Sequence, residues 1–120
     1  MIYTSYFNNK RKGEGIKLAI CRYYPKWLLQ DEYIHVPQLS PSDSLRIAYK
    51  TGEINFRTFI ERFNAEMTQE ELGHLATYIN QSQEEGKDLY LCCHEADLDN
   101  CHRYYFNKLL NSINVKCEEF

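Results

Sequence analysis

Two short runs in the sequence combine thiol, imidazole and charged side chains. They read Cys93-His94-Glu95 and Cys101-His102-Arg103. A thiol at the start of a helix, beside His102 and Arg103, should have a lowered pKa and more thiolate at neutral pH. Cys93 or Cys101 is therefore a candidate nucleophile of a cysteine-dependent enzyme, with His102 as the third catalytic candidate, and this enzyme is the alternative to the anion-binding pocket described below. The alternative is that both cysteines are small buried residues of the core, which is common for this residue type.

The two Cys-His pairs also contain the ligand types that zinc prefers. Their spacing does not match a known zinc-finger pattern, and adjacent Cys and His side chains seldom point the same way. A zinc site made of Cys93, His94, Cys101 and His102 is therefore kept as an alternative, and the sequence identifies no cofactor.

A buried strand followed by a helix should position these residues. Residues 89–93 are apolar or nearly so without alternation, which is typical of a strand covered on both faces. Asp97 or Asp99 can cap the following helix, which places residues 101–103 in or near its first turn. Because a helix start carries partial positive charge, Arg103 is unfavourable there by about 0.3–1 kcal/mol unless an anion lies nearby. That anion is either an external ligand or a carboxylate of Glu95, Asp97 or Asp99.

Cationic side chains follow a second predicted strand, at residues 16–21. If this strand runs parallel to the 89–93 strand, their carboxyl ends meet at one rim, where open α/β sheets bind ligands. Arg22, Lys26, Glu95 and Arg103 would then line a pocket for a phosphate-bearing ligand, either a nucleotide or a nucleic acid, with tyrosines available to stack on a base. A binding module without catalysis would need the same pocket.

Ser5, at the end of the first predicted strand, is a weaker ligand-binding candidate. The connection between the first two strands is only about nine residues, which is shorter than a parallel crossover needs. We therefore do not expect these two strands to be direct parallel neighbours.

The remaining patterns complete a single α/β domain. Strands are predicted at 2–7, 16–21, 89–93 and 113–117, the last as an edge strand, with residues 28–39 as a loop. Helices are predicted from Ser40 or Ser42 to Lys50, over 55–67, and over 68–85, where a capping box marks the start. The order favours a compact, Rossmann-like three-layer domain over residues 1–120, with a mainly parallel central sheet flanked by helices.

The composition limits the classes of function. The chain has 120 residues and a net charge of −3 with both signs mixed, so any nucleic-acid contact must be local. Neither a signal-peptide pattern nor a run of about 20 apolar residues is present, so we expect a cytoplasmic protein without membrane contact. The five cysteines are odd in number and irregularly spaced, so we expect reduced thiols.

Several segments together form a recognisable pattern: residues 2–7, 19–27 and 63–67, and the run 91–95 followed by 101–103. Through them the chain resembles the family called domain of unknown function 488, especially its small stand-alone bacterial members. The Cys-x-Glu run followed by Cys-His-Arg is the specific part of the resemblance. The family usually has a proline or glycine in the loop before Cys-His-Arg, whereas residues 96–100 here read Ala-Asp-Leu-Asp-Asn. The resemblance implies a compact α/β domain with a site at these motifs, and it implies no particular reaction.

Overall fold

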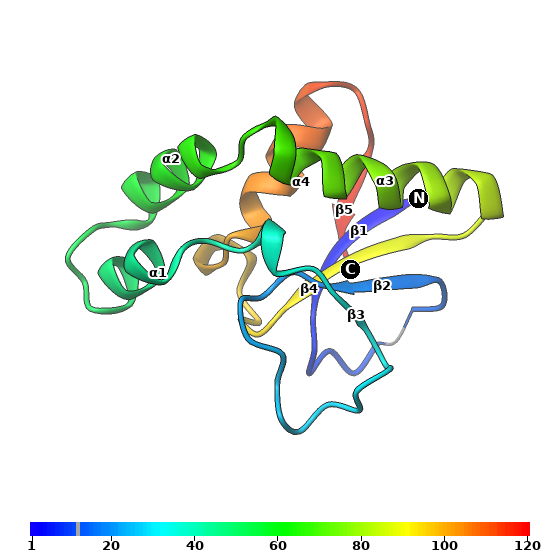
Figure 1. The fold of residues 1–120 in the computed structure, drawn as a ribbon, viewed down its shortest axis with the longest axis horizontal. Helices are drawn as coiled ribbons and strands as arrows, with labels where there is room; N and C mark the ends of the chain where they lie inside the picture. The colour runs from blue at the N-terminus through cyan, green and yellow to red at the C-terminus, as the bar shows by residue number, and fades with distance from the viewer. Residues whose placement is uncertain (12) are drawn as a thin grey trace.

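Within residues 1–11 and 13–120, which this computed structural model describes, five parallel strands form one sheet in the order β3-β2-β4-β1-β5 (Figure 1). The strands are β1 (Ile2–Tyr6), β2 (Ile16–Ala19), β3 (Ile34–His35), β4 (Leu89–Cys93) and β5 (Cys117–Glu119). β4 is central and pairs in parallel with β2 on one side and β1 on the other. The predicted parallel sheet is therefore confirmed, and β1 and β2 are not neighbours, as expected.

β4 is buried over its whole length because both faces of the sheet are covered. Leu89, Leu91 and Cys93 belong to the core beneath the helices, whereas Tyr90 and Cys92 belong to a second core on the opposite face. This alternation follows from strand geometry, in which successive side chains point to opposite faces. Cys93, the last residue of β4, therefore points to the helical side of the sheet.

The helices are α1 (Asp43–Lys50), α2 (Phe56–Glu66), α3 (Gln69–Glu85) and α4 (Arg103–Ser112), with two short 3-10 helices, η1 (Pro37–Leu39) and η2 (Leu98–Asn100), in the connections. Ser42 and Asn55 cap α1 and α2 with their side-chain oxygens, and Thr68 and Glu71 form the predicted capping box of α3. The three predicted helices before β4 are confirmed. Across the described residues, every helix falls short of the length and apolar character that a membrane-spanning segment requires.

Loops form the third layer, on the face of the sheet opposite the helices. The segments between β1 and β2 and between β2 and β3 cross this face, below the sheet in Figure 1. Aromatic rings fill the space there. Tyr3 stacks on Tyr90 with ring centroids 5.2 Å apart, and Phe7 packs edge-on against Tyr33 at 5.0 Å. The expected three-layer domain is therefore present, with helices on one face and aromatic loops on the other.

The first two strands end earlier than predicted, at Tyr6 and Ala19, and three further elements differ more from what the sequence predicts. α4 begins at Arg103, and not at Asp97 or Asp99, because Asp97 caps η2 by accepting from the Asp99 N–H at 3.1 Å. β3 lies inside the stretch predicted as a loop, and its two residues are too few to show a period. The last strand is Cys117–Glu119 rather than 113–117, because Asn114, with a φ of 63°, forms a turn after α4.

Candidate functional site

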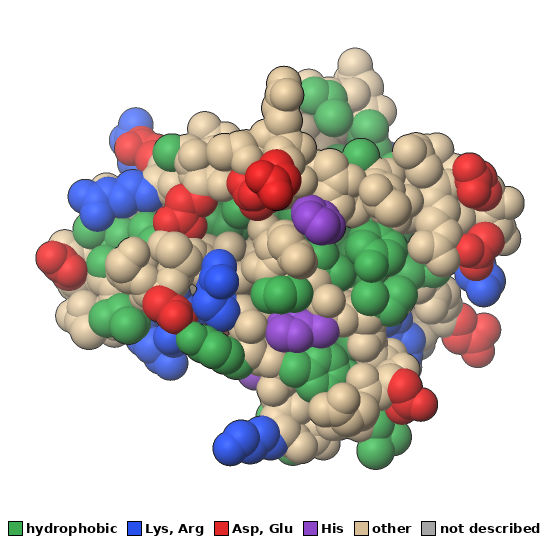
Figure 2. Space-filling view, in the orientation of Figure 1, with side chains coloured by type: hydrophobic (Ala, Val, Ile, Leu, Met, Phe, Trp, Pro, Cys, Tyr) green, Lys and Arg blue, Asp and Glu red, His purple; other side chains and the backbone are tan. Residues whose placement is uncertain are grey.

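A pocket of about 970 Å³ opens at the carboxyl ends of β2 and β4. Its walls come from the residues that follow these strands, from α1, and from the segment that joins β4 to α4. Figure 2 shows Lys and Arg side chains, with acidic ones among them, at the end of the molecule that carries α1 and α2. Open α/β sheets bind ligands beyond the carboxyl ends of their strands, so this pocket is the candidate site.

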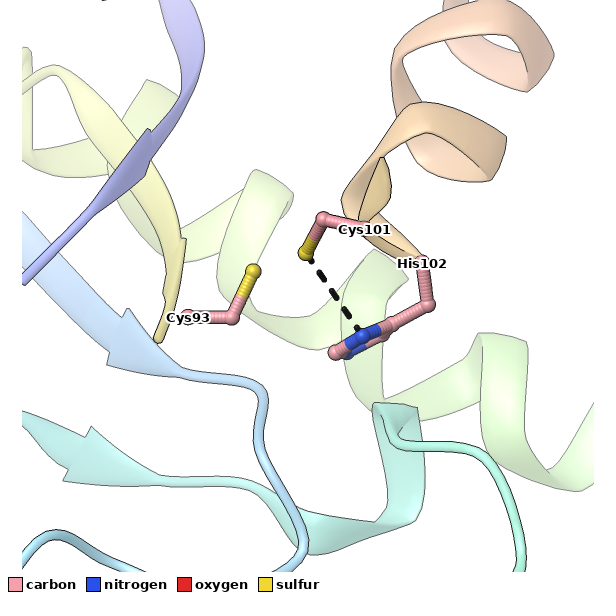
Figure 3. A group of neighbouring side chains, drawn as sticks. All are labelled: Cys93, Cys101 and His102. Atoms are coloured by element: carbon pink, nitrogen blue, oxygen red, sulfur yellow. Dashed lines mark hydrogen bonds between the residues drawn. The ribbon is translucent and has the colours of Figure 1, made fainter. Parts of the chain in front are cut away.

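Three of the predicted site residues, Cys93, Cys101 and His102, meet in this pocket (Figure 3). Their sulfur and ring nitrogen atoms all lie within 4.8 Å of one another. Cys93 comes from the end of β4, and the other two residues lie between η2 and α4. The three residues are only 2%, 5% and 8% exposed, so they form the floor of the pocket.

A hydrogen bond to the backbone fixes the tautomer of His102. Its Nε2 atom lies 2.7 Å from the carbonyl oxygen of Ile20, just after β2. Because a carbonyl oxygen can only accept, Nε2 carries the proton. In the neutral ring Nδ1 then has a lone pair, and this atom lies 3.8 Å from Cys101 Sγ. His102 is therefore oriented to accept the thiol proton of Cys101.

Cys101 and Cys93 differ in acidity. Burial raises the pKa of Cys101, but a hydrogen bond from Cys93 and the positive charges of His102 and Arg103 outweigh burial and hold this pKa well below its usual range. Burial and the neighbouring Cys101 raise the pKa of Cys93 well above its ordinary value. The first proton of the pair therefore leaves Cys101, and Cys93 stabilises the thiolate as a hydrogen-bond donor.

Arg103 lies behind the cluster and does not face the pocket. It is 0% exposed, and its Nε and Nη2 atoms donate to the carboxylate of Glu119 at 3.1 and 2.8 Å. Nη2 also donates to the carbonyl oxygen of Ala96 at 3.0 Å, and Nη1 donates to that of Glu95 and lies 3.4 Å from Cys93 Sγ. The sequence suggested an external anion or a nearby acidic side chain as the partner of this guanidinium, and the partner is instead Glu119. Arg103 thus positions the pocket floor.

Two cations that the sequence reasoning missed, Arg46 and Lys50, line the pocket from α1. Arg46 Nη2 pairs with Asp43 Oδ1 at 3.3 Å, and Arg46 Nε is buried without a hydrogen-bond partner among the described residues. The available signal was their i, i+4 spacing, which places both side chains on one face of the helix. Positive charge therefore reaches the pocket from a helix that carries none of the recognised motifs.

The other predicted ligand-binding residues differ in placement. Arg22 and Glu95 line the pocket, although Arg22 Nε donates to the carbonyl oxygen of Pro41 at 2.9 Å. Lys26 is exposed on the loop after β2 and lies outside the lining of this pocket. Ser5 lines a separate, small cavity on the loop side of the sheet. The structure therefore brings Arg22 and Glu95 to the cluster and leaves Lys26 and Ser5 away from it.

Cys93, Cys101 and His102 are close enough together to be considered as ligands of a metal ion. His102 Nδ1 would be the nitrogen that faces the ion, since Nε2 is bonded to the backbone. However, the guanidinium of Arg103 lies 3.4 Å from Cys93 Sγ, and this fixed positive charge opposes a dication at the same sulfur. The donor set therefore fits thiol chemistry better than it fits zinc.

Comparison with known proteins agrees with the motif pattern. The family model described as the active DUF488-N3 subclade matches residues 2–114, which include both the Cys-x-Glu and the Cys-His-Arg runs. No curated protein and no solved structure matches the chain. Since the family model covers nearly the whole length of the given sequence, the chain belongs to the DUF488 family and to its active N3 subclade.

Proposed function

We propose that this protein is a cysteine-dependent enzyme that acts on a phosphate-bearing ligand, with Cys101 as the nucleophile and His102 as its general base. The observation that carries the proposal is the 2.7 Å hydrogen bond between His102 Nε2 and the Ile20 carbonyl, which leaves Nδ1 facing Cys101 Sγ at 3.8 Å. A thiol, a base that accepts its proton and a group that orients the base form the pattern of an activated nucleophile. The family model describes the subclade as active, which agrees with an enzymatic role.

In the proposed reaction the thiol proton of Cys101 moves to His102 Nδ1, and the thiolate attacks an electrophilic atom of the ligand. The imidazolium then returns the proton to the leaving group. Cys93 donates a hydrogen bond to the thiolate, and Arg103 supplies a positive charge from behind the pocket floor, so both favour the reactive form. Glu95 is a further acid-base group on the pocket wall.

Three cations favour a phosphate-bearing ligand. Arg22, Arg46 and Lys50 line the pocket together with the acidic residue Glu95, so the described lining carries more positive than negative charge in a chain whose net charge is −3. The volume of about 970 Å³ lies at the upper end of the range for small-molecule pockets, about 300–1,000 Å³. A nucleotide or the end of a single-stranded nucleic acid fits this combination. The exposed ring of Tyr23, on the pocket wall, is available to stack on a base.

The pH dependence of alkylation tests the nucleophile. The protein is treated with iodoacetamide, and mass spectrometry identifies each modified cysteine and its rate constant. We expect Cys101 to react at neutral pH, below the ordinary thiol pKa of about 8.5. Cys101→Ser should remove this fast reaction, and Cys117→Ser, at the sheet edge, is the matched control that should retain it. Reaction of Cys101 only above the ordinary pKa, or zinc bound at one ion per chain, would contradict the proposal.

A matched pair of reagents tests the preference for anions. Iodoacetate is negatively charged and iodoacetamide is neutral, and both alkylate the same thiol. We expect Arg46→Gln and Lys50→Gln each to slow iodoacetate by roughly threefold at low salt and to change the iodoacetamide rate little. Arg57→Gln, which removes a cation with an 89% exposed side chain on α2, is the control. Equal slowing of both reagents would contradict an anion site at these residues.

A further inference from the structure

We propose that Cys93 is a second catalytic thiol, which attacks a mixed disulfide formed on Cys101, so that the site reduces small anionic disulfides. This inference rests on the proposed nucleophile and adds a second substrate class, small anionic disulfides, beside the phosphate-bearing ligand. In the reaction described above, Cys93 serves only as a hydrogen-bond donor. Its position at the pocket floor, however, is that of a second sulfur nucleophile.

The two sulfur atoms point towards each other across the pocket floor (Figure 3). They lie within 4.8 Å of one another, and a disulfide bond requires about 2.05 Å. Cys101 has an extended backbone, with φ −136° and ψ 146°, between η2 and α4. Closing the disulfide therefore takes a rotation of the Cys101 side chain and a shift of the connection between η2 and α4.

Arg103 gives Cys93 the charge partner that an attacking thiolate needs, because its Nη1 atom lies 3.4 Å from Cys93 Sγ. While Cys101 is a thiolate, its negative charge keeps the pKa of Cys93 high. Once Cys101 is bound in a mixed disulfide, that charge is gone and Arg103 favours ionisation of Cys93. The order of the two ionisations therefore matches the order of the two attacks.

The exchange balances with the disulfide RSSR as the oxidant. The Cys101 thiolate attacks one sulfur of RSSR, the bond between the two sulfurs breaks, and the first RS⁻ leaves with the proton from His102. Cys93 then loses its proton, and its thiolate attacks Cys101 Sγ. A bond forms between Cys93 and Cys101, and the second RS⁻ leaves and takes up that proton. Two protein thiols are oxidised, and one disulfide is reduced to two thiols.

The cations of the pocket should select the charge of the disulfide. Oxidised glutathione is anionic and cystamine is cationic, so the two probes differ in the sign of their charge. For each state of the protein, the rate constant of Cys101 with oxidised glutathione is divided by that with cystamine. We expect this ratio to be roughly tenfold higher in the folded protein than in the reduced, urea-unfolded protein. Arg46→Gln with Lys50→Gln should reduce this preference, and Arg57→Gln, on α2, should not. Equal preference in the folded and unfolded protein would overturn the assigned substrate class.

Mass spectrometry after reaction with oxidised glutathione identifies the products. The wild-type protein should lose two hydrogen atoms, carry a bond between Cys93 and Cys101, and retain no glutathione. Cys93→Ser should instead retain glutathione on Cys101. Cys92→Ser is the matched control, because Cys92 is adjacent in sequence but belongs to the core on the opposite face of β4, and it should still form the bond. Dithiothreitol should restore the reduced protein.

The outcomes separate this inference from the proposed nucleophile. Glutathione that stays on Cys101 of the wild type, or a bond from Cys101 to Cys21, would overturn the role of Cys93 and leave Cys101 as the nucleophile. A Cys101 that reacts with neither disulfides nor iodoacetamide would overturn both proposals. Thermal unfolding shows whether each variant is folded, and Cys93→Ala provides an apolar replacement if Cys93→Ser does not fold.

Discussion

The guanidinium of Arg103 and the carboxylate of Glu119 form a two-point ion pair inside the domain. Nε and Nη2 lie 3.1 and 2.8 Å from the two carboxylate oxygens, and the side chains are 0% and 30% exposed. The pair joins the first residue of α4 to β5, while the other donors of Arg103 hold the backbone carbonyls of Glu95 and Ala96. One buried cation therefore ties the edge strand, the helix start and the segment before Cys101 together.

Glu119→Gln should lower the free energy of unfolding by roughly 3 kcal/mol, because it leaves the buried guanidinium of Arg103 without its charge partner. Urea denaturation followed by circular dichroism measures the loss. Glu61→Gln is the matched control, since it breaks the exposed Arg57–Glu61 pair, whose side chains are 89% and 66% exposed. This control should cost less than about 1 kcal/mol. Equal losses in the two variants would show that burial adds nothing to the Arg103 pair.

His102→Gln should raise the pKa of Cys101. The substitution removes the imidazolium charge beside the thiolate, while the glutamine amide can still donate to the carbonyl of Ile20. The pH at which iodoacetamide alkylation reaches half its maximal rate should therefore move upwards. His74→Ala, on α3, is the control and should leave the profile in place. An identical profile for His102→Gln and the wild type would exclude His102 as the base.

Gly15→Ala should cost more than about 2 kcal/mol of stability. Gly15 has a φ of 145°, and a Cβ atom there would lie 2.3 Å from the backbone carbonyl oxygen of Asp88. To remove this clash, β2 and β4 would have to move apart. Gly73→Ala, in α3, is the opposite case, because its added Cβ meets no atom within 4 Å and should stabilise the helix by roughly 0.5–1 kcal/mol. Thermal unfolding compares the two, and a Gly15→Ala variant as stable as Gly73→Ala would contradict the close approach.

Stability should fall at alkaline pH through two buried thiols. Burial, and then the carboxylates of Glu119 and Glu118, raise the pKa of Cys117 from 9.0 to about 12, and burial raises that of Cys21 to about 11. Because folding raises these pKa values, the unfolded chain loses the protons first. The contribution is fully present below about pH 9 and is lost as the pH rises through 11 and 12. The midpoint of urea unfolding, measured below and above pH 9, reports this loss of stability. The midpoint of Cys117→Ala should fall less with rising pH than that of the wild type. An equal alkaline loss would assign the effect to other groups.

Much of the fold is predictable from local signals. Ser42, Asn55 and the capping box at Thr68 mark helix starts because each cap acts on backbone N–H groups within the next turn. Because a capping signal is local, it also explains why the start of α4 was predicted wrongly. Asp97 is a good cap, but it caps η2, and a single sequence does not show which of two adjacent elements uses the signal.

The thiols and the imidazole of the site were predictable, and so were Arg22 and Glu95, but its other charged residues were not. Cys93, Cys101 and His102 could be placed together because a strand end and the helix after it define one rim. Which cations face the pocket depends on contacts between distant parts of the chain. Arg103 pairs with Glu119 on β5, and Arg46 and Lys50 reach the pocket because α1 forms one of its walls. The i, i+4 spacing of Arg46 and Lys50 shows that they share a helix face, but no local pattern shows that this face lines the pocket.

β1 has a further consequence for how the domain assembles. Ile2 pairs with Leu89 on one side and with Cys117 on the other, so this strand finds both of its neighbours only in much later parts of the chain. Loop closures of this length slow folding, and the sheet cannot close during synthesis until those segments have emerged. Until β5 docks, Arg103 lacks its carboxylate. Thiolate reactivity at Cys101 should therefore arise late in refolding, and its time course would report the arrival of β5.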